Sequence, residues 1–270
     1  MEERNNLDVS VILPINSSKQ KGFVDLFERC IKSLNGQLMG INELVIVHSG
    51  ESNLKEILES YDFSGLTVNL VQNDGETDFA TQLNLGVENA KSKWVSIFEF
   101  DDEYSTIWFK NAKRYIDAYP EVGVFLPLVV DTDEKGMFAG FTNEATFAVS
   151  LNSDMGYLTN DVLMTYQNFQ TSGMVIKKSD YKDNGGFKKS FKLTFVYEFL
   201  LRLTHNSVKI MTIPRIGYKH TNLREGSLFW SYKFGNNKIT DGEVSFWIES
   251  AKKEHFFTAD RDIKYIPESV

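Results

Sequence analysis

Four carboxylates lie within five positions, at Glu99, Asp101, Asp102 and Glu103, where the apolar segment 94–100 ends. Acids this close repel one another, and a hard divalent cation bound between them relieves the repulsion. Because all of these ligands are oxygens, the pattern favours Mg²⁺ or Mn²⁺ over zinc. The alternative is an acidic turn that caps the next helix, since acids are common at helix N-termini.

Three further polar segments also follow apolar runs. They are Asn-Ser-Ser at 16–18, His-Ser-Gly-Glu-Ser-Asn at 48–53 and Asn-Asp-Gly at 73–75. In an open α/β sheet, ligands bind where strands end and loops begin, because backbone groups and helix N-termini converge there. The three segments and the acidic cluster are therefore predicted to lie at one edge of a sheet.

The runs before these polar segments are short, apolar and rich in β-branched residues, which predicts buried strands at 9–15, 43–50, 66–74 and 94–100. Between the strands, apolar residues recur at three- and four-residue steps, which is typical of one face of a helix. The predicted helices cover about 23–34, 54–61 and 80–92. The alternation of strand and helix predicts a parallel sheet with right-handed crossovers.

The second half of the chain is less regular. It predicts a helix at 108–119, an extended segment at 122–130, hairpins or loops from 131 to about 160, a strand within 172–181, a helix at 195–206, a strand at 207–214 and a mostly helical, aromatic tail at 227–270. No internal repeat or low-complexity linker separates these elements. The sequence therefore predicts one domain with a C-terminal extension.

Composition excludes several classes of protein. The 270 residues are 42% hydrophobic and 13% aromatic, a globular profile, and the formal charge of −8 disfavours a nucleic acid partner held through its phosphates. The single cysteine, Cys30, excludes an internal disulfide. The polar N-terminus and the lack of a long apolar run predict a cytoplasmic protein without a transmembrane segment, whereas the oligomeric state has no signature.

The order of the motifs resembles that of family 2 glycosyltransferases with the GT-A fold. The matching motifs are Pro14-Ile15-Asn16, Cys30-Ile31-Lys32-Ser33-Leu34, Asn73-Asp74-Gly75, Asn84-Leu85-Gly86, Glu99-Phe100-Asp101-Asp102, and Gly185-Gly186-Phe187 before a helix that bears Glu198 and Arg202. The resemblance covers roughly residues 9–227. It implies an α/β fold of the nucleotide-diphospho-sugar transferases, a central, mostly parallel sheet flanked by helices. Residues 1–226 would form this domain, with a nucleotide-sugar half at 9–103 and an acceptor half at 104–226.

The resemblance also implies a role for individual residues. Asp101 would hold the ribose of a nucleotide-sugar, and Asp102 would ligate Mn²⁺ or Mg²⁺ at its diphosphate. The residues expected to surround the donor are Pro14, Ile15, Asn16, Ser49, Glu51, Asn73 and Asn84. His220 would complete the metal's coordination, and Arg224 would pair with phosphate oxygens. The alternatives are a loop histidine bonded within the protein and a surface ion pair.

The sequence departs from the family pattern at four places, one of which is Leu83, where the family commonly has an arginine. The turn after the second strand reads His48-Ser49-Gly50-Glu51 and lacks the aspartate that usually accepts a hydrogen bond from the base, so Ser49 or Glu51 would replace it. The first acid of the metal motif is Glu99, which is expected to support its loop more than to bind metal. Phe195 and Val196 occupy the positions of the usual Glu-Asp pair. The nearest acid, Glu198, is therefore the predicted general base, and its alternative is an ion pair with Arg202 four residues on.

The sequence thus predicts a metal-dependent glycosyltransferase that moves a sugar from a nucleotide-diphosphate donor to a hydroxyl acceptor, with inversion. The acceptor would be a glycan, a lipid-linked sugar or a protein. The alternatives are a nucleotidyltransferase of related fold and a degenerate module that binds a nucleotide-sugar without catalysis. The donor sugar, its base and the acceptor are not specified.

Overall fold

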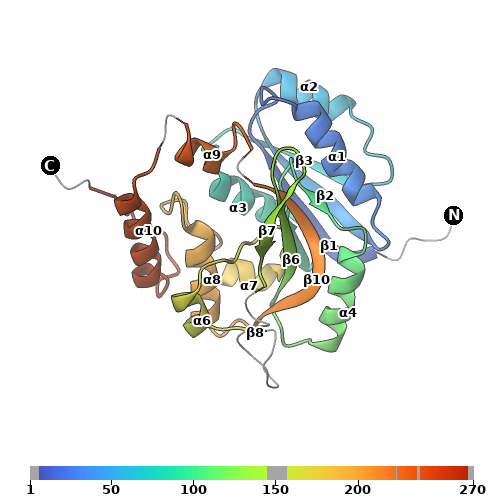
Figure 1. Ribbon diagram of the computed structural model, residues 1–270. Coiled ribbons are helices and arrows are strands. Elements are labelled where there is room, and N and C mark those ends of the chain that lie inside the picture. Colours follow the sequence, from blue (N-terminus) through green and yellow to red (C-terminus); the bar gives the residue numbers. More distant parts are fainter. Residues whose placement is uncertain (1–5, 145–156, 223, 236–237, 267–270) are drawn as a thin grey trace.

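The computed structural model describes residues 6–144, 157–222, 224–235 and 238–266 (Figure 1). The strands are β1 (Asn6–Ile15), β2 (Gly40–Ser49), β3 (Val68–Asn73), β4 (Trp94–Ile97), β5 (Glu103–Tyr104), β6 (Val124–Thr132), β7 (Phe138–Thr142), β8 (Tyr157–Leu158), β9 (Val175–Lys177) and β10 (Ile210–Thr221). The helices are α1 (Phe23–Asn35), α2 (Ser52–Ser60), α3 (Phe79–Asn89), α4 (Trp108–Ala118), α6 (Asn160–Thr165), α7 (Lys178–Asp183), α8 (Phe195–His205), α9 (Leu228–Lys233) and α10 (Asp241–Glu254).

One sheet runs through the molecule in the order β3-β2-β1-β4-β9-β6-β10-β5, with β7 on β6 and β8 on β10. The first four strands are parallel, as the β-α alternation predicts. β9 is antiparallel to both β4 and β6, so the second half is mixed. From β1 the chain adds β2 and β3 on one side and then β4 on the other side, so the strand order reverses at β1. In α/β sheets, ligands bind in the crevice at such a point.

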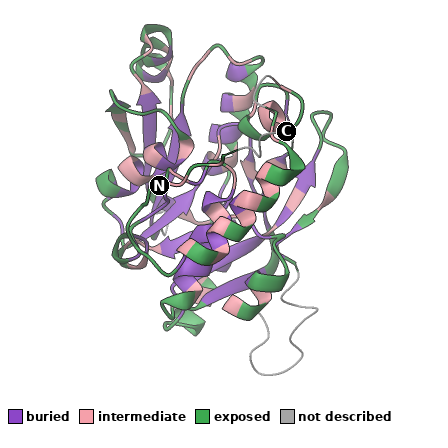
Figure 2. Cartoon of the chain, turned by 90° about the vertical axis from the view of Figure 1, so that its left-hand side faces the viewer, coloured by how far each residue is buried: buried purple, intermediate pink, exposed green. Residues whose placement is uncertain are grey.

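Helices cover both faces of the sheet, and α1, α2 and α4 lie on the face opposite α3 and α8 (Figure 1). The strands are buried on both sides: Val11 and Leu13 of β1 pack with the first group of helices, whereas Ile12 packs with the second. Continuous apolar runs are typical of strands covered on both faces. Figure 2 shows this burial along the strands, and the predicted α/β architecture with a central sheet is confirmed.

The predicted end of the strand that begins near residue 207 is wrong. We expected the strand to end at Pro214, but it continues to Thr221 and pairs with β6 along most of its length. The register shifts between Ile213 and Ile216, next to Pro214, because proline has no N–H to donate to the ladder. His220, predicted to lie in a loop, is therefore held inside a strand.

The predicted tail contains two helices, α9 and α10, of which α10 packs against α8. Trp247 and Ala251 of α10 are buried in the same apolar core as Phe199 and Leu203 of α8. The tail is thus part of the wall on one side of the sheet (Figure 1). Across the described residues, no helix has both the length and the apolar content that a membrane crossing requires.

Candidate functional site

The acidic cluster lies where β4 ends, at the predicted edge of the sheet, and β5 fixes its position. Tyr104 and Glu103 of β5 pair antiparallel with Tyr218 and Lys219 of β10. This pairing brings the end of β10 against the acidic loop although more than a hundred residues separate them. The end of β4 therefore positions the acids, and residues of β10 and of the segment after it form their ion pairs and hydrogen bonds.

Asp102 is fully buried and both of its oxygens have protein partners. Oδ1 accepts from the backbone N–H of Thr221 at 2.8 Å, and Oδ2 lies 2.9 Å from Nδ1 of His220. Burial alone would lower the pKa of His220, but the charge of Asp102 and this hydrogen bond outweigh it and raise the pKa to about 10. The imidazolium therefore neutralises Asp102, and Nε2 becomes available to a cation only after the ring loses its proton there.

Asp101 is paired with Arg224. Its Oδ2 accepts from Nε of Arg224 at 2.6 Å, and the guanidinium also donates to the side chain of Gln20 and lies over the ring of Phe100. Burial and the neighbouring Asp102 still raise the pKa of Asp101, despite the opposing charge of Arg224. The pair joins the acidic loop to the segment after β10.

Glu99 is the acid that the sequence predicts to support its loop more than to bind metal. Its Oε1 accepts from the hydroxyl of Ser172 at 2.7 Å, and burial, followed by the charge of Asp102, raises its pKa to about 7. Glu99, Asp102 and His220 each offer a ligand atom, and these atoms lie within 4.8 Å of one another. Two carboxylates and one imidazole, crowded enough to raise a pKa, fit a divalent cation.

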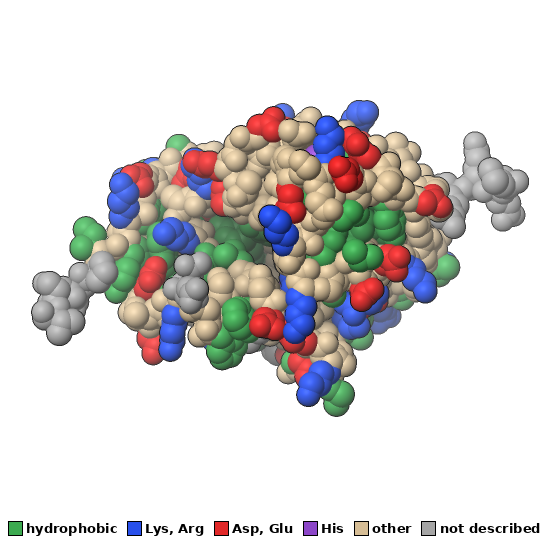
Figure 3. All heavy atoms as spheres, turned by 90° about the horizontal axis from the view of Figure 1, so that it is seen from above, with side chains coloured by type: hydrophobic (Ala, Val, Ile, Leu, Met, Phe, Trp, Pro, Cys, Tyr) green, Lys and Arg blue, Asp and Glu red, His purple; other side chains and the backbone are tan. Residues whose placement is uncertain are grey.

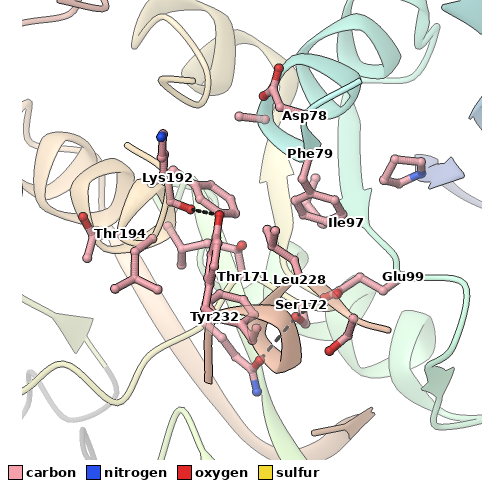
Figure 4. A pocket seen from close by; sticks show the side chains of 18 of the residues that line it. Asp78, Phe79, Ile97, Glu99, Thr171, Ser172, Lys192, Thr194, Leu228 and Tyr232 are labelled. Carbon is pink, nitrogen blue, oxygen red and sulfur yellow. Dashed lines mark hydrogen bonds between the residues drawn. The ribbon is translucent and has the colours of Figure 1, made fainter. Parts of the chain in front are cut away.

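A cavity of about 780 Å³ opens at this edge of the sheet (Figure 4). Five of the residues singled out as site candidates line it: Pro14, Asn16, Asp101, His220 and Arg224. Glu99 and Ser172 also line it, and their side chains point toward one another in Figure 4. A volume of this size suits a ligand of nucleotide-sugar dimensions.

Ile15, Ser49 and Glu51 do not line the cavity. Ile15 is buried in the core. The hydroxyl of Ser49 donates to the backbone oxygen of Asn16 at 2.7 Å, and Glu51 accepts from two serine hydroxyls in the loop after β1 at 2.7 and 2.9 Å. These bonds tie the loops after β1 and β2 together, and the hydrogen bond from Ser17 is the main cause of the lowered pKa of Glu51.

Asn73 and Asn84 are bonded within the protein instead of facing the cavity. Asn73 stabilises its own turn, because its amide donates to the backbone oxygen of Glu76 and its oxygen accepts from the N–H of Gly75. Asn84 donates to the backbone oxygen of Phe187 at 2.8 Å and accepts from the Phe187 N–H at 2.9 Å. Both amides are therefore engaged in hydrogen bonds within the protein, and neither residue lines the cavity.

Glu198 also needs correction. Its carboxylate is fully buried in α8 and lies 2.8 Å from Lys188 Nζ and 2.8 Å from Arg202 Nη2. Arg202 in turn donates to the backbone oxygens of Asn184 and Gly186, and Lys188 donates to those of Glu254 and Phe257. A carboxylate held by two cations and shielded from the cavity has no path to an acceptor, so this geometry argues against Glu198 as the general base.

One part of the cavity is built by the C-terminal helices, whose place in the site local sequence patterns do not specify. Leu228, Phe229 and Tyr232 of α9 and Val244 and Ile248 of α10 line it, facing the first turn of α8. The aromatic content of the tail was the one available signal, because the contacts join segments about fifty residues apart. Phe195 and Val196 line the same side, so the positions of the usual acid pair are apolar in space as well.

Comparisons with known proteins place this geometry in a family. Residues 10–177 match the model of glycosyl transferase family 2. Among solved structures, S. aureus TarS 1–349 in complex with UDP-GlcNAc is 18% identical with a TM-score of 0.63, over 83% of this chain and 61% of that chain. No curated protein matches.

A mannosyltransferase from Pyrobaculum calidifontis, in complex with GDP-Man and Mn²⁺, is 16% identical with a TM-score of 0.58, over 83% of this chain and 60% of that chain. The chain thus spans about three fifths of these solved chains. At such identities the likeness concerns the fold, and it confirms the predicted GT-A architecture. The chain belongs to glycosyl transferase family 2.

Proposed function

We propose that the protein is a metal-dependent glycosyltransferase that moves a sugar from a nucleotide-diphosphate donor to a hydroxyl acceptor, with inversion. One observation carries the proposal: Glu99, Asp101, His220 and Arg224 line a single cavity at the point where the strand order reverses. Family membership and two solved neighbours that hold UDP-GlcNAc and GDP-Man support the donor class.

The donor wall consists of Pro14, Asn16, Asp101 and Arg224. We assign the ribose to the free oxygen of Asp101, because Oδ2 is occupied by Arg224. The guanidinium of Arg224 would approach the diphosphate, where its planar donors suit phosphate oxygens. The ion pair holds both side chains in place before the donor binds, which lowers the ordering cost.

Glu99, Asp102 and His220 would hold the cation. When bound, it neutralises the charge that the leaving nucleoside diphosphate gains as the bond to the sugar breaks. Asp102 keeps the Nδ1–H of His220 in a hydrogen bond, which orients the ring and leaves Nε2 for the cation. The hydroxyl of Ser172 orients Glu99 in the same way.

A hydroxyl acceptor needs a base in place of Glu198. The acids that line the cavity within the described residues are Asp78, Glu99 and Asp101. The last two are committed to the cation and to Arg224, whereas Asp78 uses one oxygen to accept from the N–H of Thr81. We propose Asp78 as the base. Asp78→Asn should lower the turnover number by about 10²–10⁴-fold and leave donor binding intact.

Thermal denaturation with UDP, GDP and their sugar conjugates, with and without Mn²⁺, tests the donor and the metal together. A ligand at one hundred times its Kd stabilises the native state by about 2.7 kcal/mol. We expect the melting temperature to rise with either the uridine or the guanosine compounds, and only when Mn²⁺ is present. Stabilisation by every nucleotide without Mn²⁺, or by none, would refute the proposal.

Release of the nucleoside diphosphate distinguishes the remaining alternatives. A transferase releases it from the sugar conjugate, whereas a binding module without catalysis releases none. A nucleotidyltransferase would instead produce pyrophosphate from a nucleoside triphosphate and a sugar phosphate.

A further inference from the structure

The part of the cavity built by the segment before α8 and by α8, α9 and α10 has a different chemistry from the acidic loop. We define the apolar wall as Leu193, Phe195, Val196, Leu228, Val244 and Ile248, contributed by the first turn of α8 and the segment before it, by α9 and by α10. In Figure 4 the side chains of Leu228 and Tyr232 extend from α9 into the cavity. Figure 3 looks onto the molecule from above and shows hydrophobic side chains within a recess on this face.

The hydroxyls on this side are directed into the protein. Thr194 donates to the backbone oxygen of Trp247 at 3.0 Å, Tyr197 to that of Leu163 at 2.8 Å, and Ser231 to that of Leu228 at 2.7 Å. Tyr232 donates to the backbone oxygen of Lys192 at 3.4 Å, a longer contact drawn as a dashed line in Figure 4. With these hydroxyls used, this side presents mainly carbon to the cavity, apart from Lys189 and Lys192 in the segment before α8.

The aliphatic side chains of this wall are poor partners for a bare sugar, whereas Phe195 adds one ring face. Leucine, valine and isoleucine offer neither a hydrogen bond to a sugar hydroxyl nor a ring face on which a sugar can stack, and a buried hydroxyl without a partner costs about 1–3 kcal/mol. An aliphatic chain buried there loses water contact without leaving a polar group unpaired. Leu228 and Phe229, 42% and 46% exposed, continue the apolar surface to the outside.

We propose that the apolar wall binds an aliphatic chain attached to the acceptor, so that the acceptor is an amphiphile. The proposal rests on the proposed function, because Glu99 and Asp101 must bind the donor and its cation for this wall to be left to the acceptor. It also gives the C-terminal helices a role, since α9 and α10 supply half of the wall. The chain enters beside Phe229, and its polar head lies toward Glu99 and Asp78.

Calorimetric titration with alkyl β-glucosides from methyl to octyl tests the proposal, with geranyl β-glucoside as the isoprenoid arm. Affinity should rise two- to fourfold per methylene, the upper value corresponding to ~0.8 kcal/mol for each buried CH₂. A stronger response to geranyl than to octyl glucoside would identify an isoprenoid chain as the preferred source. Equal affinity for the methyl and octyl compounds would overturn the proposal.

Leu228→Asp and Val244→Asp place a charge in the wall and should weaken octyl glucoside binding at least tenfold. Leu38→Asp is the matched control, because Leu38 is 67% exposed and lies outside the cavity. An equal loss in the control would mean that the effect is not local. Since Leu228 is already partly exposed, its variant should fold, which a melting curve verifies.

Nucleoside diphosphate with Mn²⁺ is titrated in parallel to separate the two proposals. If the nucleotide binds and chain length has no effect, the acceptor inference is wrong and the proposed function stands. If chain length matters and no nucleotide binds, the proposed function is wrong instead. Displacement of octyl glucoside by the nucleotide would show that the chain occupies the donor side, which also overturns the acceptor inference.

Discussion

Asp102 and Glu198 are both buried carboxylates in ion pairs, and the two pairs differ in the kind of cation. Asp102 is neutralised by His220, a group that can lose its proton and that lines the cavity. Glu198 is neutralised by Lys188 and Arg202, which are 2% and 0% exposed and which also donate to backbone oxygens of neighbouring loops. Because His220 can lose its proton, it can still bind a ligand. Lys188 and Arg202 stay charged and bind backbone oxygens as well, so their ion pairs with Glu198 have a structural role.

Replacement of Glu198 should have the largest effect, and that effect should be on stability. Glu198→Gln leaves two buried cations without their counter-charge, a loss of about 3–5 kcal/mol of unfolding free energy. Transfer by the fraction that remains folded should be close to normal. Urea denaturation and nucleoside diphosphate release measure the two quantities, and a stable protein without activity would restore Glu198 to a catalytic role.

Asp102→Asn should show the opposite pattern. Because His220 can release its proton, no buried charge is stranded and the loss of stability should be smaller than for Glu198→Gln. The rate of transfer should fall by about 10²–10³-fold, the cost of losing one preorganised electrostatic group. Transfer rates over a Mn²⁺ titration measure this, and an unchanged response to Mn²⁺ would contradict the assignment of the cation site.

Arg224→Lys sharpens the comparison with a third pair, Asp101 and Arg224. Lysine keeps the charge but loses the planar donors that also reach Gln20, so affinity for the nucleoside diphosphate should fall about tenfold, or ~1.4 kcal/mol. Lys21→Gln is a suitable control because Lys21 forms an exposed ion pair with Glu225, and such pairs contribute little. Equal effects of the two changes would argue against a specific role for Arg224.

The smallest effect concerns His255, which lies near the ion pairs of Glu198. Burial, with the nearby His205, lowers the pKa of His255 below 6.5. A histidine with a lowered folded-state pKa stabilises the protein above its unfolded pKa, and this contribution is lost as the pH falls below about 6.5. Urea midpoints at pH 7.5 and 5.5 should therefore differ more for the wild type than for His255→Gln. A larger difference in the variant would reverse the inferred sign.

The fold was largely predictable from the sequence because its main signals are local. Strands β1 to β4 and helices α1 to α4 follow from apolar runs and from three- and four-residue spacing. The end of β10 was not predictable, since the shift beside Pro214 is absorbed by pairing with β6, a partner remote in sequence. Residues 145–156, where hairpins or loops were predicted, lie outside the described residues.

Asp101 was singled out because acids follow a strand end, and His220 and Arg224 were singled out from the family resemblance; all three line the cavity. The candidate site was not predictable where a side chain's role depends on what covers it. Spacing shows that Glu198 and Arg202 share a helix face, but only packing shows that the face is buried against Lys188 and the Gly-Gly turn. The same holds for Asn73 and Asn84, whose amides are used by the backbone.

The sequence by itself determined the family, the order of the first strands and helices, and the position of the acids at a strand end, because these depend on residue type and short-range periodicity. Only the tertiary structure decided which acids face the cavity, which cation neutralises each, and that α9 and α10 build the apolar wall. Those properties depend on how the elements pack in space, as where His220 meets Asp102 more than a hundred residues earlier in the chain, and local patterns carry no information about such packing.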